Sequence, residues 1–294
     1  MLLKLNWMAG AALAAALLGG CAAEEDAADS GAADDQGQME EQTEETTDGK
    51  NADGESAEEK AEDKEEGSEG SQVPATAEPA EALYELNEAT WSFRPIGDAD
   101  PKAALLTIDD APDKHALDMA KTLKQLDAPA IFFVNGHFID TDEEKAVLKE
   151  IHEMGFPIGN HTMSHPNLKQ IPEEAQREEI LGVNKIVEQV TGEKPKFFRA
   201  PFGVNTDFTR QLAADEGMLL MNWTYGYDWE PQYQDGDALA DIMVNTEFLN
   251  NGANLLMHDR EWTAAALPKI VQGLRDKGYT LINPATIKMP ESAQ

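Results

Sequence analysis

Two histidines and two neighbouring aspartates have the types and spacing of a metal site in this 294-residue chain. His161 and His165 lie four positions apart, so on a helical turn or in a tight loop both imidazoles can face one ion. Asp109 and Asp110 are adjacent, and their like charges require a cation or an arginine nearby. Two imidazoles and one carboxylate leave a position for water, which is the pattern of a catalytic zinc site, although other divalent ions suit the same ligands.

A hydrolytic metal site also needs groups that move protons. One of the two aspartates can ligate the ion while the other accepts a proton from water. His258 is the natural general acid, because an imidazole can titrate near the working pH. The alternative is that His258 is a surface residue of the run His258-Asp259-Arg260. Three further histidines are expected at the surface without a role: His115, His137 and His152.

From about Tyr84 onward, short apolar runs alternate with longer amphipathic stretches. The apolar runs predict seven strands, at Ala103–Ile108, Ala130–Val134, Phe156–Asn160, Lys196–Ala200, Met218–Trp223, Asn254–Met257 and Tyr279–Ile282. The stretches between them predict helices at Asp113–Leu126, Thr141–Met154, Pro172–Val190, Thr206–Glu216, Gly236–Leu249 and Glu261–Lys277. This alternation predicts a parallel α/β fold, either an open doubly wound sheet or an imperfect barrel. There is no dinucleotide fingerprint and no phosphate loop.

Local signals mark the ends of several predicted helices. Thr141 is followed three residues later by Glu144, which is the spacing of a capping box. Gly155, Gly217 and Gly278 each follow a helical stretch directly, where a left-handed C-terminal cap places glycine.

The unusual polar residues all follow the predicted strands at their C-terminal ends. These residues are Asp109, Asp110, Asn135, His161, His165, Arg199, Asp228 and His258. Both barrels and open α/β sheets build their active sites on that face. The placement therefore indicates one site assembled from six strands.

Five segments together resemble the motifs of the polysaccharide deacetylases, the NodB-homology group of carbohydrate esterase family four. They are Thr107–Pro112, His161–His165, Arg199–Gly203, Asp228–Trp229 and Leu256–His258, which follow the family's order across roughly residues 100–285. The resemblance implies a distorted seven-stranded, TIM-like (β/α)7 barrel and a divalent metal ion, usually Zn²⁺. It also implies removal of N-acetyl groups from a polysaccharide.

Carried over residue by residue, the resemblance assigns the metal and the base. It makes Asp110, His161 and His165 the metal ligands and Asp109 the general base. Arg199 is implied to orient Asp109 through a charge-assisted hydrogen bond.

The resemblance also assigns the acid and the substrate pocket. His258 is implied to protonate the leaving amine, with Asp228 holding its imidazolium. Trp229 and Leu256 are implied to form the walls of a pocket for the acetyl methyl group. A main-chain N–H near Phe202 would stabilise the oxyanion together with the metal.

Three positions depart from the family's motifs. Ala111 replaces a glycine, which would cause strain if the position required a positive φ. Phe202 stands where tyrosine is common, and Tyr225 occupies the place of a frequent aspartate. None of these changes removes an implied ligand, base or acid.

The N-terminal segment has the features of a targeting signal and is not expected to be part of the folded domain. Residues 1–20 resemble a lipoprotein signal peptide that ends in Leu18-Gly19-Gly20-Cys21, and an ordinary signal peptide is the alternative. Cys21, the chain's single cysteine, is expected to carry the lipid, so disulfides are excluded from the mature protein. The expected linker at 21–82 is acidic and predicted to be disordered, because residues 22–80 hold 21 Asp and Glu against three Lys. It is either a tether or simply a solubilising tail.

The remaining residues, 83–294, are expected to form one catalytic domain. The net charge of −33 argues against binding nucleic acid or anionic lipid by electrostatic attraction. We expect an extracytoplasmic, membrane-anchored monomer that acts on peptidoglycan. Chitooligosaccharide, exopolysaccharide and acetylxylan remain alternative substrates, and a catalytically impaired wall-binding lipoprotein is the alternative from another functional class.

Overall fold

The computed structural model describes residues 81–290, so the expected signal peptide, Cys21 and nearly all of the expected linker lie outside the described residues. The hairpin strands are β1 (Tyr84–Asn87) and β2 (Ser92–Pro95). The strands of the main sheet are β3 (Ala103–Ala111), β4 (Ala130–Val134), β5 (Ile158–Asn160), β6 (Phe197–Phe198), β7 (Leu219–Leu220), β8 (Ala253–His258) and β9 (Thr280–Leu281). The helices are α1 (Ala116–Gln125), α2 (Asp142–Glu153), α3 (Glu173–Thr191), α4 (Asp207–Asp215), α5 (Gly236–Asn245) and α6 (Glu261–Asp276).

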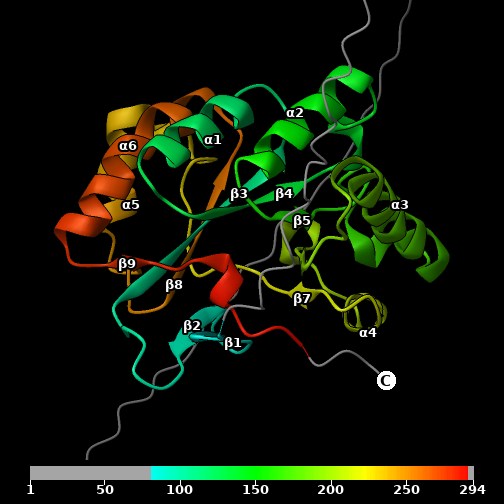
Figure 1. Cartoon of the computed structure of the whole chain (residues 1–294), viewed down its shortest axis with the longest axis horizontal. Helices are drawn as coiled ribbons and strands as arrows, with labels where there is room; N and C mark the ends of the chain where they lie inside the picture. Colours follow the sequence, from blue (N-terminus) through cyan, green and yellow to red (C-terminus); the bar gives the residue numbers. More distant parts are fainter. Residues whose placement is uncertain (1–80, 291–294) are drawn as a thin grey trace, which may run out of the picture. The chain divides into compact units, whose positions relative to one another are not determined.

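The main sheet is the distorted barrel that the sequence predicts. Its strands follow the order β7-β6-β5-β4-β3-β8, with β9 paired to the start of β3, and its ladders are all parallel. The edge strands β7 and β8 are not joined by a ladder; the chain after β7 reaches β8 through an isolated bridge between Tyr225 and Leu255. Figure 1 shows the helices around the outside of the curled sheet, where right-handed β-α-β crossovers place them.

Strand β3 is buried on both faces and sends its side chains alternately into two cores. Ala104, Leu106 and Ile108 pack with side chains of the surrounding helices. Ala103 and Leu105 point the other way, into the interior of the barrel. Strand β4 alternates in the same manner. Burial on both faces explains why these strands are continuous apolar runs in the sequence.

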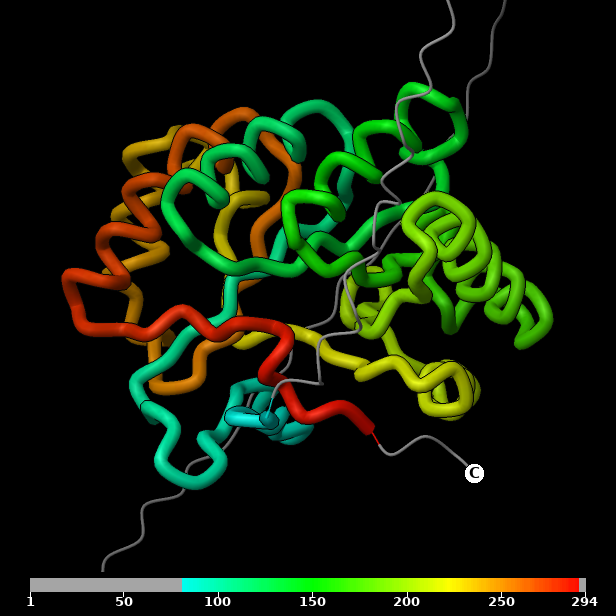
Figure 2. Tube along the Cα trace, viewed as in Figure 1, coloured from blue at the N-terminus to red at the C-terminus, as the bar shows by residue number. Residues whose placement is uncertain are grey.

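The β1–β2 hairpin, which the sequence analysis did not predict, covers the barrel interior at the N-terminal ends of the strands. Tyr84 and Phe93 join the interior core there. Gly252 has a φ of +76°, and a Cβ at this position would lie 1.9 Å from the carbonyl oxygen of Phe93, so only glycine fits. A bridge between Tyr84 and Ile287 brings the first and last parts of the described chain side by side, as Figure 2 shows.

The local signals at the helix ends are confirmed. Thr141 and Glu144 form the predicted capping box at the start of α2. Gly155, Gly217 and Gly278 all have left-handed backbone conformations, with φ of +97°, +71° and +79°. These residues therefore end their helices as a left-handed cap does.

Several elements are shorter than the sequence predicts. Strands β6 and β7 have two residues each, because only this part of each apolar run pairs with a neighbour. Helix α5 ends at Asn245 because the backbone of Thr246 is extended. Helix α1 begins at Ala116 instead of Asp113.

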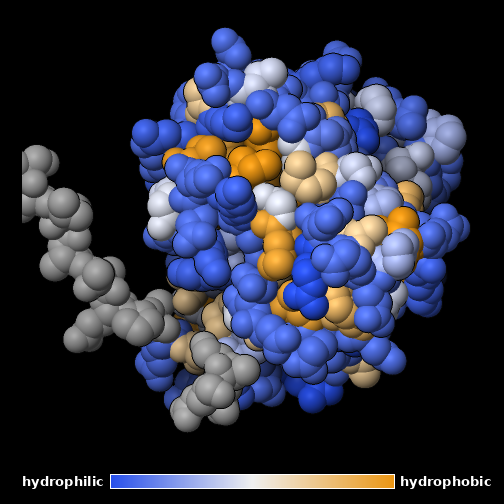
Figure 3. Space-filling view, turned by 90° about the vertical axis from the view of Figure 1, so that its right-hand side faces the viewer, coloured by the Kyte–Doolittle hydropathy of each residue, from blue (hydrophilic) through white to orange (hydrophobic). Residues whose placement is uncertain are grey.

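None of the helices in the described residues is long and apolar enough to span a membrane. The face shown in Figure 3 is predominantly hydrophilic, with small, separate apolar groups. Few large apolar side chains of the described residues are exposed, and two of them, Phe202 and Trp229, lie at the C-terminal mouth of the barrel.

Candidate active site

The inner face of β3 changes from apolar to polar along the strand. Leu105 is followed on this face by Thr107 and Asp109, both of which are buried. One nitrogen of Arg199, Nη1, donates to Thr107 Oγ1 at 2.8 Å and to Asp109 Oδ1 at 2.6 Å. The two-residue period of the strand thus carries Asp109 into the C-terminal mouth of the barrel.

Asp110 reaches the same site although a regular strand would turn it to the opposite face. The pairing between β3 and β4 shifts register between Ile108 and Ala111. Asp110 itself has a φ of +56°, a left-handed conformation that costs a non-glycine residue roughly 1–2 kcal/mol. A bulge of this kind re-aims a side chain, so two adjacent carboxylates face one cavity.

The two histidines of the metal motif lie in a tight loop after β5, not on a helix. Thr162 and His165 have positive φ values of +70° and +59°. The carboxylate of Glu179 in α3 accepts hydrogen bonds from the N–H and hydroxyl of Ser164, at 2.8 and 2.6 Å. The Asn135 amide donates to the carbonyl oxygen of His161 at 2.6 Å. Neighbouring elements therefore fix this loop from both sides.

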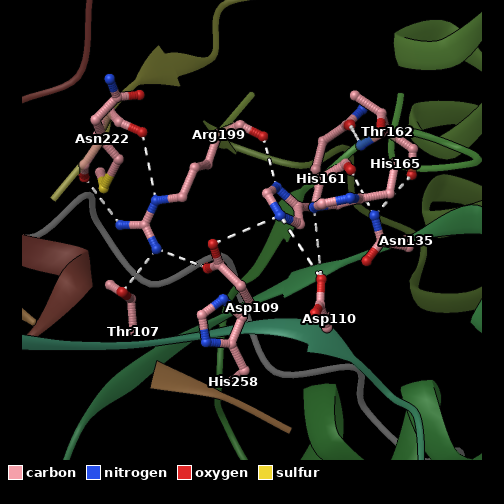
Figure 4. Close-up of polar contacts among 12 residues, drawn as sticks. Thr107, Asp109, Asp110, Asn135, His161, Thr162, His165, Arg199, Asn222 and His258 are labelled. Atoms are coloured by element: carbon pink, nitrogen blue, oxygen red, sulfur yellow. Dashed lines mark hydrogen bonds and ion pairs between the residues drawn. The ribbon is translucent and has the colours of Figure 1, made fainter. Parts of the chain in front are cut away.

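Asp110, His161 and His165 form a cluster with the composition and size of a metal site. Their potential ligand atoms all lie within 4.8 Å of one another. Asp110 Oδ1 is 3.9 Å from His161 Nε2 and 3.7 Å from His165 Nε2. Ligands of a tetrahedral zinc site lie roughly 3.4 Å apart, given metal–ligand distances of about 2.1 Å. The three residues predicted as ligands therefore fit a divalent ion (Figure 4).

Both imidazoles are held in the neutral form that binds metal. Burial and the neighbouring His165 lower the pKa of His161 to about 3, against the opposing effect of Asp110. Burial also lowers the pKa of His165. His161 Nδ1 lies 2.7 Å from the carbonyl oxygen of Arg199, so this nitrogen carries the proton and Nε2 faces Asp110.

Arg199 holds Asp109 beside the metal ligands. Its side chain is fully buried, lies 4.3 Å from the ring centre of Phe133, and donates through Nη2 to the carbonyl oxygen of Asn222 at 3.0 Å. Asp109 Oδ2 points instead towards His161, with 3.5 Å between Oδ2 and Nε2. Burial raises the pKa of Asp109, although the charge of Arg199 opposes the rise. A carboxylate with these properties can accept a proton.

His258 and Asp228 form the second pair of titratable groups. His258 Nδ1 lies 2.7 Å from Asp228 Oδ1, and the hydroxyl of Thr263 donates to Asp228 Oδ2 at 2.8 Å. Burial lowers the pKa of His258, but the hydrogen bond and negative charge of Asp228 outweigh it, so the pKa is raised. The pairing fixes Nδ1 and leaves Nε2 as the nitrogen that can give a proton to a substrate.

A cavity of about 480 Å³ opens above these groups. Charged and imidazole side chains line this cavity together with large apolar side chains. The apolar side chains are Phe202, Trp223, Trp229, Leu256 and Trp262. Phe202 is 63% exposed and packs edge-on against His165, with ring centres 4.7 Å apart. Trp229 is 47% exposed and stands perpendicular to His258 at 5.7 Å. The three predicted pocket residues thus lie around the catalytic groups.

Comparisons with known proteins agree with this geometry. Residues 96–221 match the family described as polysaccharide deacetylase. A peptidoglycan-N-acetylglucosamine deacetylase of Bacillus cereus is 32% identical over 190 residues, which cover 62% of this chain and 85% of that protein. The chain belongs to the polysaccharide deacetylase family.

Two further similarities bear on the length and fold of this member of the family. A second Bacillus cereus protein of the same description is 30% identical over 186 residues; the match covers 60% of this chain and 65% of the relative's length. A solved peptidoglycan N-acetylglucosamine deacetylase matches with a TM-score of 0.59 at 26% identity, over 65% of this chain and 91% of that one. The similarity to the solved structure thus covers about two thirds of this chain and nearly all of that one.

The departures from the family motifs do not displace the residues of the candidate site. Asp110, and not Ala111, has the positive φ, so alanine causes no backbone strain at its position. The Tyr225 hydroxyl donates to the carbonyl oxygen of Met243 at 2.7 Å, which places this side chain in the core beside α5. The N–H groups of Gly203 and Val204 donate within a 3₁₀ turn. The N–H of Phe202 itself is then the candidate oxyanion donor.

Several residues of the site were not predicted from the sequence, among them four that hold predicted residues in place. Asn222 accepts from Arg199, Trp262 Nε1 donates to the carbonyl oxygen of Asp228 at 2.7 Å, and Glu179 holds the histidine loop. Arg260 donates to Asp110 at 2.8 Å. Of these four, only Arg260 could have been suspected from the sequence, because it lies two residues after His258. The other three belong to none of the family's motifs, and their roles depend on contacts in the folded chain.

Proposed function

We propose that this protein is a metal-dependent hydrolase that removes N-acetyl groups from an N-acetylglucosamine-type polysaccharide, with peptidoglycan as its substrate. One observation carries the proposal. A carboxylate with a raised pKa, Asp109, and an imidazole with a raised pKa, His258, flank a cluster of three metal-ligand side chains at the mouth of one cavity. That combination supplies a base, an acid and an electrophile at one place.

A divalent ion held by Asp110, His161 and His165 would supply a Lewis acid that polarises the amide carbonyl and acidifies a water molecule. Asp109 accepts a proton from the attacking water, while Arg199 keeps the carboxylate oriented through the 2.6 Å hydrogen bond. The water oxygen bonds to the carbonyl carbon. The N–H of Phe202 would stabilise the negative charge that develops on the carbonyl oxygen.

His258, the register partner of Asp109 on β8, completes the reaction. Its Nε2 gives a proton to the amide nitrogen as the C–N bond breaks, and Asp228 stabilises the imidazolium before this transfer. The products are acetate and a free amino sugar. Leu256 and Trp229 exclude water around the acetyl methyl group, since both line the apolar part of the cavity.

Two observations support a glycan of the cell wall as the substrate. The cavity is open and has exposed aromatic rings at its rim, which suits a long sugar chain better than a small enclosed ligand. The relatives described above act, by their descriptions, on N-acetylglucosamine of peptidoglycan. We infer the same sugar for this protein.

Acetate release tests the proposed function. The full-length chain is incubated with peptidoglycan, chitooligosaccharide and acetylxylan, with added zinc or with a chelator, and the products are weighed by mass spectrometry. We expect a loss of 42 Da per N-acetyl group only where zinc is present, and only from N-acetylated sugars. Acetate release that is unchanged by the chelator, or no release from any of the three glycans while zinc is bound, would contradict the proposal.

We also propose that Cys21 carries a lipid that anchors the protein on the outer side of the cytoplasmic membrane. The support is the Leu18–Cys21 pattern after an apolar stretch, together with a substrate that lies outside the cytoplasm. The test is metabolic labelling with an alkyne fatty acid. We expect label on the wild-type chain and none on Cys21→Ala, and release of that variant from the membrane fraction. Equal labelling of both chains would contradict the anchor.

A further inference from the structure

The two oxygens of the Asp110 carboxylate have different partners. Oδ1 faces the two imidazoles, at 3.7 Å from His165 Nε2 and 3.9 Å from His161 Nε2. Oδ2 accepts a hydrogen bond from Arg260 Nη2 at 2.8 Å. One oxygen is therefore directed at the metal position while the other is held by a guanidinium.

We propose that Arg260 is a positioning residue for the metal: it holds Asp110 in the orientation that ligates the ion. This inference rests on the metal site of the proposed function and adds a residue outside the ligand set. Asp110 needs such a restraint, because its φ of +56° is a left-handed conformation that a non-glycine residue adopts only when its surroundings enforce it.

Arg260 can enforce this orientation because its own segment is fixed. Its second nitrogen, Nη1, donates to the carbonyl oxygen of Asp259 at 2.9 Å and lies 3.9 Å from the carboxylate of Asp113. The N–H of Asp259 donates in turn to the carbonyl oxygen of Asp109 at 3.0 Å. The guanidinium thus bridges the ends of β3 and β8, which carry the base, a metal ligand and the acid.

The carboxylate of Asp259 strengthens the same connection. It is buried and accepts main-chain hydrogen bonds from Asp113, Lys114, His115 and Ala116, at 2.7 to 3.1 Å. These residues form the loop that leads from Asp110 into α1. The consecutive residues Asp259 and Arg260 therefore hold the metal-binding end of β3 through its main chain and through its Asp110 side chain.

Arg260 has two opposing effects on a bound cation. Its positive charge repels the ion, whereas its hydrogen bond reduces the freedom of a ligand that would otherwise rotate. The Arg260 side chain is 36% exposed, so solvent screens the repulsion, and orientation dominates. Removal of a group that orients a metal ligand weakens binding by about 10–100-fold.

Zinc affinity of the full-length chain tests this inference. Each variant competes for Zn²⁺ with a chromophoric chelator, and the visible spectrum of the Co²⁺-loaded protein reports the ligand arrangement. We expect Arg260→Ala to bind zinc about 10–100-fold more weakly than the wild type and to change the Co²⁺ spectrum. Arg260→Lys should recover part of the affinity, because it keeps one donor for Asp110. Arg210→Ala removes an exposed arginine that pairs with Glu88 and should match the wild type.

The zinc-binding results can contradict the positioning role of Arg260 without contradicting the proposed function. A wild type that binds no zinc contradicts the proposed function. A wild type that binds zinc, with Arg260→Ala equally tight or tighter and spectrally unchanged, overturns the positioning role alone. Thermal unfolding of the metal-free proteins shows whether Arg260→Ala folds. If it does not, Arg260→Met, which keeps an apolar stem and removes the donors to Asp110, decides, and wild-type affinity and spectrum in that variant overturn the inference.

Discussion

Asp109 and His258 are register partners on the neighbouring parallel strands β3 and β8. Each has its own buried partner of opposite charge, Arg199 at 2.6 Å and Asp228 at 2.7 Å. Asp109 and His258, which we propose as the base and the acid, are thus held by different partners. Because each group is held and tuned by a different partner, substitutions in each pair should have distinct effects.

Asp109→Asn should abolish turnover and spare the metal. The amide cannot accept a proton, so kcat should fall by roughly 10²–10⁴-fold, the usual contribution of a general base. Asp110, His161 and His165 are unchanged, so zinc content per protein should stay near that of the wild type. His161→Ala is the comparison, and it should lose both zinc and activity. Substantial kcat in zinc-loaded Asp109→Asn would show that another group is the base.

Arg199→Met should destabilise the fold. The substitution leaves the Asp109 carboxylate buried without its partner, and breaking a buried ion pair in this way costs about 3–5 kcal/mol. Urea unfolding in the presence of a chelator measures this loss without a contribution from bound metal. The exposed Arg210 provides the control, since Arg210→Met should change stability by no more than about 0.5 kcal/mol. Similar unfolding midpoints for the two variants would contradict the role assigned to Arg199.

The parallel strands could be predicted from the sequence because they are buried on both faces, whereas the choice of a barrel over an open sheet came from the family resemblance. Leu105 and Leu106 point into different cores, which makes the run apolar without interruption and recognisable. The hairpin strands Tyr84–Asn87 and Ser92–Pro95 are short and mostly half-exposed, so they carry no comparable signal. These two strands are stabilised by packing against the N-terminal end of the barrel, which is formed by the rest of the described chain.

The candidate metal-binding residues could also be predicted, because each follows an apolar run, although the choice of Asp110 over Asp109 came from the family resemblance. The orientation of these side chains could not be predicted from the sequence. The φ of Asp110 and the register shift beside it arise from pairing between β3 and β4. The hydrogen bond from Arg260 joins residues 150 positions apart. Contacts of this kind form only in the assembled barrel, between residues far apart in the chain. No local sequence pattern predicts them.

Asp228→Asn should shift the pH dependence of the reaction. His258 must be protonated to act as the acid, so kcat/KM falls as the pH rises through its raised pKa. Removing the charge of Asp228 lowers that pKa, and the alkaline limb should therefore move to lower pH by about 1–3 units. A pH profile of kcat/KM with saturating zinc measures the shift. Asp237→Asn, at an exposed ion pair with Lys269, should leave the limb in place. An alkaline limb that stays fixed in Asp228→Asn would exclude His258 as the group that titrates there.

Asp259→Ala should loosen the start of α1 together with the end of β3. The Asp259 carboxylate is the acceptor for the N–H groups that precede and open this helix, whose N-cap residue His115 forms no side-chain cap of its own. Removing a buried charged acceptor costs roughly 1.5–3 kcal/mol, and the urea midpoint should fall accordingly. Asp259→Asn keeps one acceptor oxygen and should lose less. Asp118→Ala removes an exposed acid from the first turn of α1 and should cost no more than about 1 kcal/mol. If the losses in Asp259→Ala and Asp118→Ala were equal, the contribution of Asp259 would be that of a surface charge near a helix end. Arg260 would then be the side chain that links the end of β8 to Asp110.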